Sequence, residues 1–171
     1  MREIDSFHHF ERLIYQESWM DGKEKLFLTN GRLFMEIGTN GDNEGVYVDI
    51  AKETEFLDKY QGIFVYSYHT HIKNVRLNRC PQPPSFDDFC VDKRFRERAK
   101  KRGKRIVSRI LEKNGVWQYS CNSNLLPPIN LDEMIQYEIE CGNTLKERVD
   151  RLIKGYMRFG VSEIKFYKRR I

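Results

Sequence analysis

The most informative stretch of the chain is Gly62-Ile63-Phe64-Val65-Tyr66-Ser67-Tyr68-His69-Thr70-His71. Its first seven residues are rich in β-branched and aromatic side chains, which is typical of a β-strand. Side chains two residues apart in a strand point to the same face, so we expect His69 and His71 to share one side of a sheet. The stretch therefore predicts a strand that delivers a pair of imidazoles.

An acid that can complete a metal site follows in Pro83-Pro84-Ser85-Phe86-Asp87-Asp88. Ser85 comes after two prolines, where a helix can start, and a serine there caps the helix while Asp88 lies in its first turn. Such a turn can return Asp88 to the end of the histidine strand. Two imidazole nitrogens and one carboxylate oxygen leave a tetrahedral zinc with an open position, which is typical of a catalytic site. We therefore predict one zinc per chain on His69, His71 and Asp88.

The pattern His-x-His followed by Ser-x-x-Asp resembles the signature of the JAB/MPN family, the JAMM metalloproteases that remove ubiquitin or ubiquitin-like modifiers. Residues 105–110 and 114–119 are similar to the strand, turn and strand that follow the zinc loop in viral and bacterial JAB-like proteins. Two features depart from the family pattern. Ile72 stands where the family usually has proline, and the spacer between the histidines and Ser85 is longer, with residues 72–84 as an inserted loop.

The resemblance implies a zinc-dependent isopeptidase or peptidase acting on a ubiquitin-like protein conjugate or a peptide. It also implies a glutamate upstream of the histidines as general base and then acid, and Glu36 is the position that matches best. Glu44 is the alternative for that role. Ser85 would donate a hydrogen bond to the oxyanion of the tetrahedral intermediate.

Glu36 has a reason of its own to be considered, because it is the one acid in the apolar strand Leu33-Phe34-Met35-Glu36-Ile37-Gly38. An unpaired buried carboxylate is costly, so an inward-facing Glu36 needs a partner or a task. Alternation along the strand leaves an outward-facing, solvated Glu36 equally open.

The size and composition of the chain indicate a single folded domain. It has 171 residues, of which 40% are hydrophobic and 13% aromatic. That length suits one domain with its own core, and we expect it to span residues 1–171 with residues 1–24 as an N-terminal helical extension. No apolar run approaches the roughly 20 residues of a membrane span. The N-terminus does not resemble a signal peptide, so we expect a cytoplasmic protein that makes no membrane contact, located in the host cytoplasm if its source is a virus.

The four cysteines stand apart, without a Cys-x-x-Cys pair. This spacing favours reduced thiols over a disulfide framework. It leaves one rival for the metal site, a structural His2Cys2 zinc in which Cys80 and Cys90 join His69 and His71.

The remaining pattern predicts an α+β domain, a mixed β-sheet flanked by helices. Helices are expected at 7–20, 53–59, 131–140 and 144–158, and strands at 25–28, 33–38, 46–50, 62–68, 106–110, 116–121 and 161–167. Asn114-Gly115 is the strongest hairpin signal among them. The resemblance further implies the three-layer, cytidine-deaminase-like arrangement of JAB/MPN domains.

Residues 93–105 are intensely basic and account for much of the net charge of +5. Such a run forms either a solvated surface or a contact for phosphates or an acidic partner, including nucleic acid. It supports a second hypothesis, a catalytically inactive MPN-like scaffold that binds a protein or nucleic acid through this segment. The candidate contacts are Lys93, Arg94, Arg96, Arg98, Lys100, Lys101 and Arg102.

A third class, a metallophosphoesterase, needs several more histidines. The chain offers only His8 and His9, which project in different directions from a helix and cannot clamp one metal together.

Overall fold

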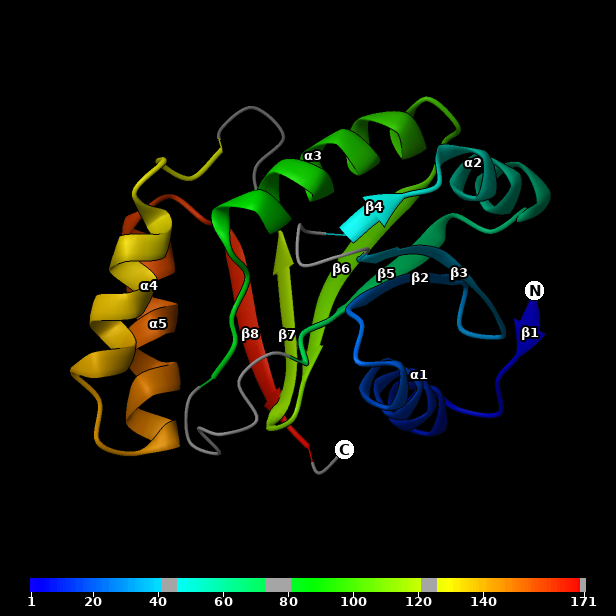
Figure 1. Ribbon diagram of the computed structural model, residues 1–171. Coiled ribbons are helices and arrows are strands. Elements are labelled where there is room, and N and C mark those ends of the chain that lie inside the picture. The colour runs from blue at the N-terminus through cyan, green and yellow to red at the C-terminus, as the bar shows by residue number, and fades with distance from the viewer. Residues whose placement is uncertain (41–45, 73–80, 121–125, 170–171) are drawn as a thin grey trace.

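The computed structural model describes residues 1–40, 46–72, 81–120 and 126–169. An eight-stranded mixed β-sheet runs through it in the order β1-β3-β2-β5-β6-β7-β8, with β4 paired to β3 (Figure 1). The strands are β1 (Arg2–Glu3), β2 (Lys25–Thr29), β3 (Leu33–Asn40), β4 (Val46–Val48), β5 (Phe64–Thr70), β6 (Arg105–Glu112), β7 (Gly115–Ser120) and β8 (Glu163–Lys168). The helices are α1 (Phe7–Asp21), α2 (Ile50–Lys59), α3 (Phe86–Lys100), α4 (Leu131–Glu140) and α5 (Leu145–Arg158).

Strands β5 and β6 form the parallel pair of this sheet, and the other described pairs are antiparallel. Parallel neighbours need a crossover connection, and here α3 supplies it. The chain therefore leaves β5 at its carboxyl end and begins α3 close to that same end of the strand. This topology brings the segment after His69 close to the first turn of α3.

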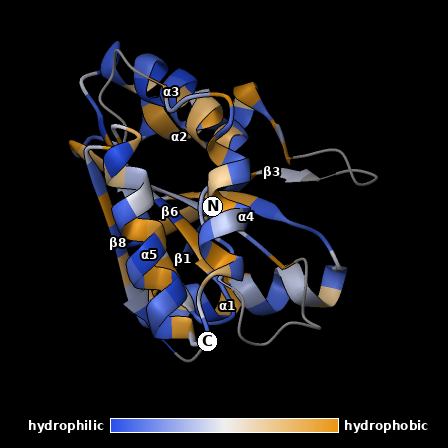
Figure 2. Ribbon diagram, turned by 90° about the vertical axis from the view of Figure 1, so that its left-hand side faces the viewer, coloured by the Kyte–Doolittle hydropathy of each residue, from blue (hydrophilic) through white to orange (hydrophobic). Residues whose placement is uncertain are grey.

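Helices cover both faces of the sheet. On one face α1 packs Phe10 and Ile14, both fully buried, against Phe27, Phe34 and Tyr68 of the strands. The N-terminal residues expected as an extension are thus part of the core. The other face carries α2 and α3 over one half and α4 and α5 over the other half (Figure 1). In Figure 2 the helices carry both hydrophobic (orange) and hydrophilic (blue) residues, as expected for helices that pack one side on a sheet.

The predicted α+β class, with a mixed sheet flanked by helices, is confirmed. Two elements go beyond the expectation: only the start of α3 (Phe86–Lys100) at Ser85 was predicted, and β1 (Arg2–Glu3) was not predicted. The other differences concern the ends of elements. The strand expected at 46–50 stops at Val48, because the side chain of Asp49 caps α2 by accepting a hydrogen bond from the Lys52 amide at 3.1 Å. Helix α2 therefore starts at Ile50, three residues earlier than expected. Strand β5 continues to Thr70, so His69 lies within it.

The longest described helices, α1 and α3, have 15 residues each, and among the described residues we find no helix with the length and apolar character that crossing a membrane requires.

Candidate metal centre

The two histidines of the motif lie at the end of β5. His69 is the penultimate residue of the strand, and its cross-strand neighbours are Leu26 of β2 and Ile110 of β6. His71 follows the strand but continues its pairing, because its backbone amide donates to the Leu111 carbonyl at 2.9 Å. The rings of His69 and His71 have centroids 4.7 Å apart, in an edge-to-face arrangement. The expected common face of the pair is confirmed.

Asp88 reaches the histidines from the first turn of α3. The Ser85 hydroxyl accepts a hydrogen bond from the Asp88 amide at 3.2 Å, and the Ser85 amide donates to Asp88 Oδ2 at 2.8 Å. This reciprocal capping box is the one that the sequence predicted. The cap fixes the direction of the Asp88 side chain as well as the start of the helix.

The three side chains form one cluster. Asp88 Oδ1 lies 2.7 Å from His69 Nδ1, and Asp88 Oδ2 lies 3.5 Å from His71 Nε2. One ligand atom from each residue lies within 4.8 Å of the other two. The side chains are 16%, 13% and 8% exposed for His69, His71 and Asp88, so solvent reaches the cluster only narrowly.

The cluster fits a zinc ion on two grounds. Its donor set of two imidazoles and one carboxylate is that of an open zinc site. In addition, His69 Nε2 is buried and has no hydrogen-bond partner among the described residues. Buried polar atoms normally have partners, so a buried ring nitrogen that no protein group satisfies, beside two other ligand groups, is suited to bind a metal.

The electrostatics of the cluster are dominated by the Asp88 carboxylate. Burial alone would raise its pKa, but the charges and hydrogen bonds of His71 and His69 hold the pKa of Asp88 well below its usual range. Burial alone would lower the pKa of His71, but Asp88, Glu24 and the hydrogen bond with the Gln82 backbone together raise it to about 9. The site therefore keeps the Asp88 anion beside a His71 that holds its proton at neutral pH, and a dication can replace that proton.

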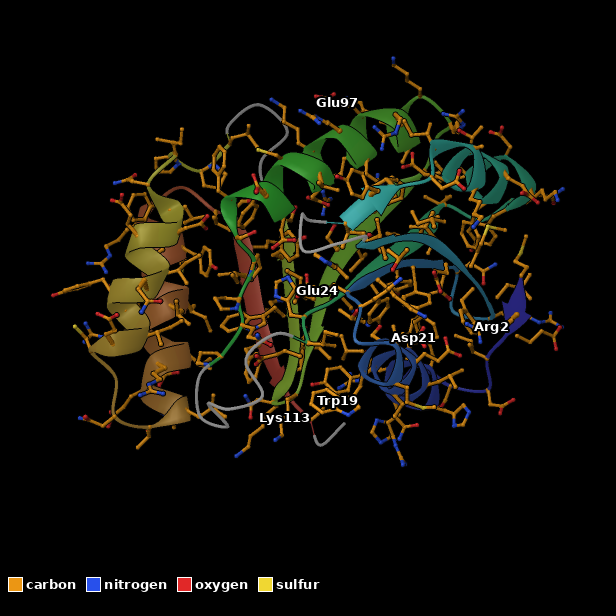
Figure 3. The ribbon with its side chains drawn as sticks, viewed as in Figure 1. Arg2, Trp19, Asp21, Glu24, Glu97 and Lys113 are labelled. Atoms are coloured by element: carbon orange, nitrogen blue, oxygen red, sulfur yellow. The ribbon has the colours of Figure 1, made fainter. Side chains whose placement is uncertain are left out.

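Glu24 is a fourth functional candidate, and the sequence analysis missed it. Its carboxylate Oε2 lies 3.9 Å from the orphaned His69 Nε2, its side chain is 11% exposed, and it lines the same cleft. Figure 3 labels Glu24, which comes from the segment between α1 and β2. Strand β2 pairs antiparallel with β5 through Leu26 and His69, and extending this register by two residues brings Glu24 opposite His71.

The structure does not bring Glu36 to the cluster. Glu36 pairs with Phe27 across the β2–β3 ladder, and Phe27 faces α1 on the opposite side of the sheet from the histidines. Its carboxylate lies 3.4 Å from Lys25 Nζ and is 35% exposed. The ion pair with Lys25 is the partner that this acid required. Glu44, the alternative, lies outside the described residues.

Ser85 lies beside Asp88, but its hydroxyl already has a task. Its oxygen donates to Asp88 Oδ2 at 2.7 Å, and a hydroxyl has one proton to donate. A role toward an oxyanion therefore requires Ser85 to turn away from Asp88.

The structural zinc with two cysteines has no support among the described residues, where the metal-ligand cluster contains no thiol. Cys90 lines the cleft, and Cys80 lies outside the described residues.

The cluster lies in a cleft of about 460 Å³. One wall comes from Val46 and Val48 of β4, and the facing wall from Val91 and Phe95 of α3. Asp92, one turn after Asp88, anchors α3 to the sheet by accepting a hydrogen bond from Ser108 Oγ of β6. It also accepts one at 2.6 Å from Arg96 Nε of the same helix. Because Asp88, Val91 and Phe95 all belong to α3, the bond from Ser108 fixes the ligand and the cleft wall together against the sheet.

The basic segment is largely a structural element. Arg96 pairs with Asp92, Arg98 with Glu53 and Arg102 with Asp58. Three of the seven candidate contacts thus bind acids of the chain itself. The four others, Lys93, Arg94, Lys100 and Lys101, lie on α3 and at its end, and all but the half-buried Lys93 are exposed.

Comparison of the chain with protein-family models, with curated proteins and with solved structures finds no match.

Proposed function

We propose that the protein is a zinc-dependent peptidase or isopeptidase of the JAMM type, with a JAB/MPN-like arrangement of its layers. The observation that carries the proposal is the buried cluster of His69, His71 and Asp88, with an orphaned His69 Nε2 and the carboxylate of Glu24 facing it at 3.9 Å. Among the described residues the ligand group consists of His69, His71 and Asp88, and three protein ligands with one open position are typical of a catalytic zinc.

In this proposal His69, His71 and Asp88 hold the metal. A bound zinc supplies a Lewis acid for an amide carbonyl and lowers the pKa of water to about 7. Glu24 replaces Glu36 as the proposed proton carrier, because a general base must lie within reach of the attacking water, directly beside the metal ligands. Its carboxylate would accept the proton from water and give it to the leaving amine.

The proposed substrate class, ubiquitin-like conjugates and peptides, is what the resemblance of the motif to the JAB/MPN family implies. The cleft that holds the cluster combines apolar side chains, Val46, Val48, Val91 and Phe95, with charged ones from α3, so it offers both apolar and polar contacts to a bound chain. The capping box and the bond from Ser108 of β6 to Asp92 add the rigidity that a catalytic constellation needs.

A matched pair of variants tests the assignment of the base. Glu24→Gln should keep zinc and lose about 100-fold or more of kcat on isopeptide-linked ubiquitin chains and on a fluorogenic isopeptide. Glu36→Gln is the control and should retain zinc and turnover, since it changes a carboxylate on the other face of the sheet. Loss of turnover in Glu36→Gln with full activity in Glu24→Gln would contradict the proposal.

The scaffold hypothesis makes a different prediction. Reversing the charges of Lys100 and Lys101, which are exposed, should abolish partner binding under that hypothesis and leave peptide hydrolysis intact under the first. A wild-type protein without zinc and without hydrolysis would favour the scaffold.

A further inference from the structure

Glu112 is a buried acid near the cluster of His69, His71 and Asp88, but it is not one of the three proposed zinc ligands. It is the last residue of β6 and is 1% exposed. The neighbouring Leu111 carbonyl accepts the hydrogen bond of the His71 amide, so the strand end that carries Glu112 is already tied to the histidine. A carboxylate in such a place is costly unless it has a partner.

One oxygen of the Glu112 carboxylate, Oε2, has the backbone of Gln82 as its partner, while Oε1 has none among the described residues. The Gln82 amide donates to Glu112 Oε2 at 2.5 Å. Gln82 stands between Pro81 and Pro83, followed by Pro84, and proline has no backbone N–H. The Gln82 amide is therefore the one backbone donor in residues 81–84. Proline also restricts the residue that precedes it, so fixing this amide fixes the direction of the Gln82 carbonyl.

The Gln82 carbonyl in turn holds His71. It lies 3.2 Å from His71 Nδ1, which leaves His71 Nε2 directed to the cluster, 3.5 Å from Asp88. A hydrogen bond on one ring nitrogen selects the tautomer that offers the other nitrogen to a metal. The hydrogen bonds from Gln82 to Glu112 and between His71 and Gln82 thus form a relay that can set the orientation of His71 and, once the proton on Nε2 leaves, its tautomer.

We propose that Glu112 is a positioning residue that orients His71 for metal binding through the backbone of Gln82. This inference rests on the proposed function for its consequence, the zinc affinity, while the orientation of His71 can be measured without metal. The relay acts through backbone groups of residue 82, so the Gln82 side chain is not part of it.

The test uses the full chain and compares zinc affinity, by competition with a chelator, in four variants. Glu112→Leu removes the acceptor and should weaken zinc binding about 10- to 100-fold. Glu112→Gln keeps an acceptor oxygen and should restore most of that loss. Gln82→Ala keeps the backbone relay and should bind like wild type. Glu138→Leu removes another buried carboxylate, held by Arg151 and Arg158 between α4 and α5, and should leave zinc affinity unchanged.

A second measurement needs no metal. The His71 Nδ1 ring proton, followed by nitrogen-edited NMR, should exchange with solvent faster in Glu112→Leu than in wild type or in Glu138→Leu. If Glu112→Leu does not fold, Gln82→Pro deletes the same hydrogen bond from its donor side and should give the same two results.

The outcomes separate the two claims. Zinc binding by wild type with unchanged affinity in Glu112→Leu would overturn the inference and leave the proposed function standing. Equal weakening in Glu138→Leu would also overturn it, because the effect would then be general destabilisation. Absence of zinc in wild type would end the proposed function, and the exchange of the His71 proton would still decide the role of Glu112.

Discussion

The substitution Arg98→Met tests whether the basic segment serves the fold. Arg98 donates to both oxygens of Glu53, with Nε to Oε1 at 2.6 Å and Nη2 to Oε2 at 2.7 Å. The side chain of Glu53 is 1% exposed, whereas that of Arg98 is 30% exposed. The pair joins the first turn of α2 to α3. Removing the guanidinium leaves a buried carboxylate without its counter-charge.

The expected loss follows from this burial. Removing one partner of a fully buried ion pair costs about 3–5 kcal/mol. Because the Arg98 side chain is partly open to water, we expect the lower end, about 3 kcal/mol in the free energy of unfolding. For a domain of this size that corresponds to a decrease of about 6–12 °C in Tm.

Urea unfolding followed by circular dichroism, in zinc-free buffer, provides the measurement. Arg94→Met is the matched control, the same replacement one turn earlier at an exposed position, and should change the free energy of unfolding by less than about 0.5 kcal/mol. Glu53→Gln combined with Arg98→Met should recover part of the loss, because no charge is then left unpaired. Equal stabilities for Arg98→Met and Arg94→Met would refute this reasoning and return Arg98 to the candidate contacts of a partner.

Three further predictions concern the surroundings of the cluster. Zinc affinity should rise about tenfold per pH unit up to about pH 9, because the pKa of His71 is raised to about 9 and its proton must leave before zinc binds. Zinc titrations at several pH values that show no change in affinity would contradict this prediction. Burial raises the pKa of Glu112 from 4.5 to about 7, so the wild-type fold should lose stability as the pH rises through this window. Glu112→Gln should not lose stability in this pH range, so its free energy of unfolding relative to wild type should rise by up to about 3 kcal/mol between pH 4.5 and pH 7. Urea unfolding of both proteins below and above this range measures the difference. Tyr156→Phe should cost about 1–2 kcal/mol in urea unfolding, because the buried Tyr156 hydroxyl donates to the Pro84 carbonyl at 2.5 Å, and a cost near zero would mean that water replaces it.

Local patterns predicted most of the helices and strands and the three clustered side chains, but not the extent of α3 or the short strand β1. The histidine spacing and the cap at Ser85 are determined by neighbours in sequence, so they predicted the arrangement of His69, His71 and Asp88. The α+β class followed from the same periodicities.

Long-range pairing explains what the sequence could not supply. Glu24 precedes the expected strand 25–28, and nothing local says that this strand lies beside β5; only the register of Leu26 with His69 brings Glu24 to the site. The face of Glu36 was open by alternation, and the ladder places it with Phe27 toward α1. Likewise, the acids that pair with Arg98 and Arg102 lie on α2, more than forty residues earlier in the chain.

The zinc content of tag-free protein, measured by elemental mass spectrometry, tests the central claim most directly. We expect about one zinc per chain in wild type, in Glu24→Gln and in a Cys80→Ser/Cys90→Ser double variant, and loss of the metal in His71→Ala. Protein that stays free of zinc after reconstitution, or that keeps it in His71→Ala and loses it in the cysteine variant, would contradict the account.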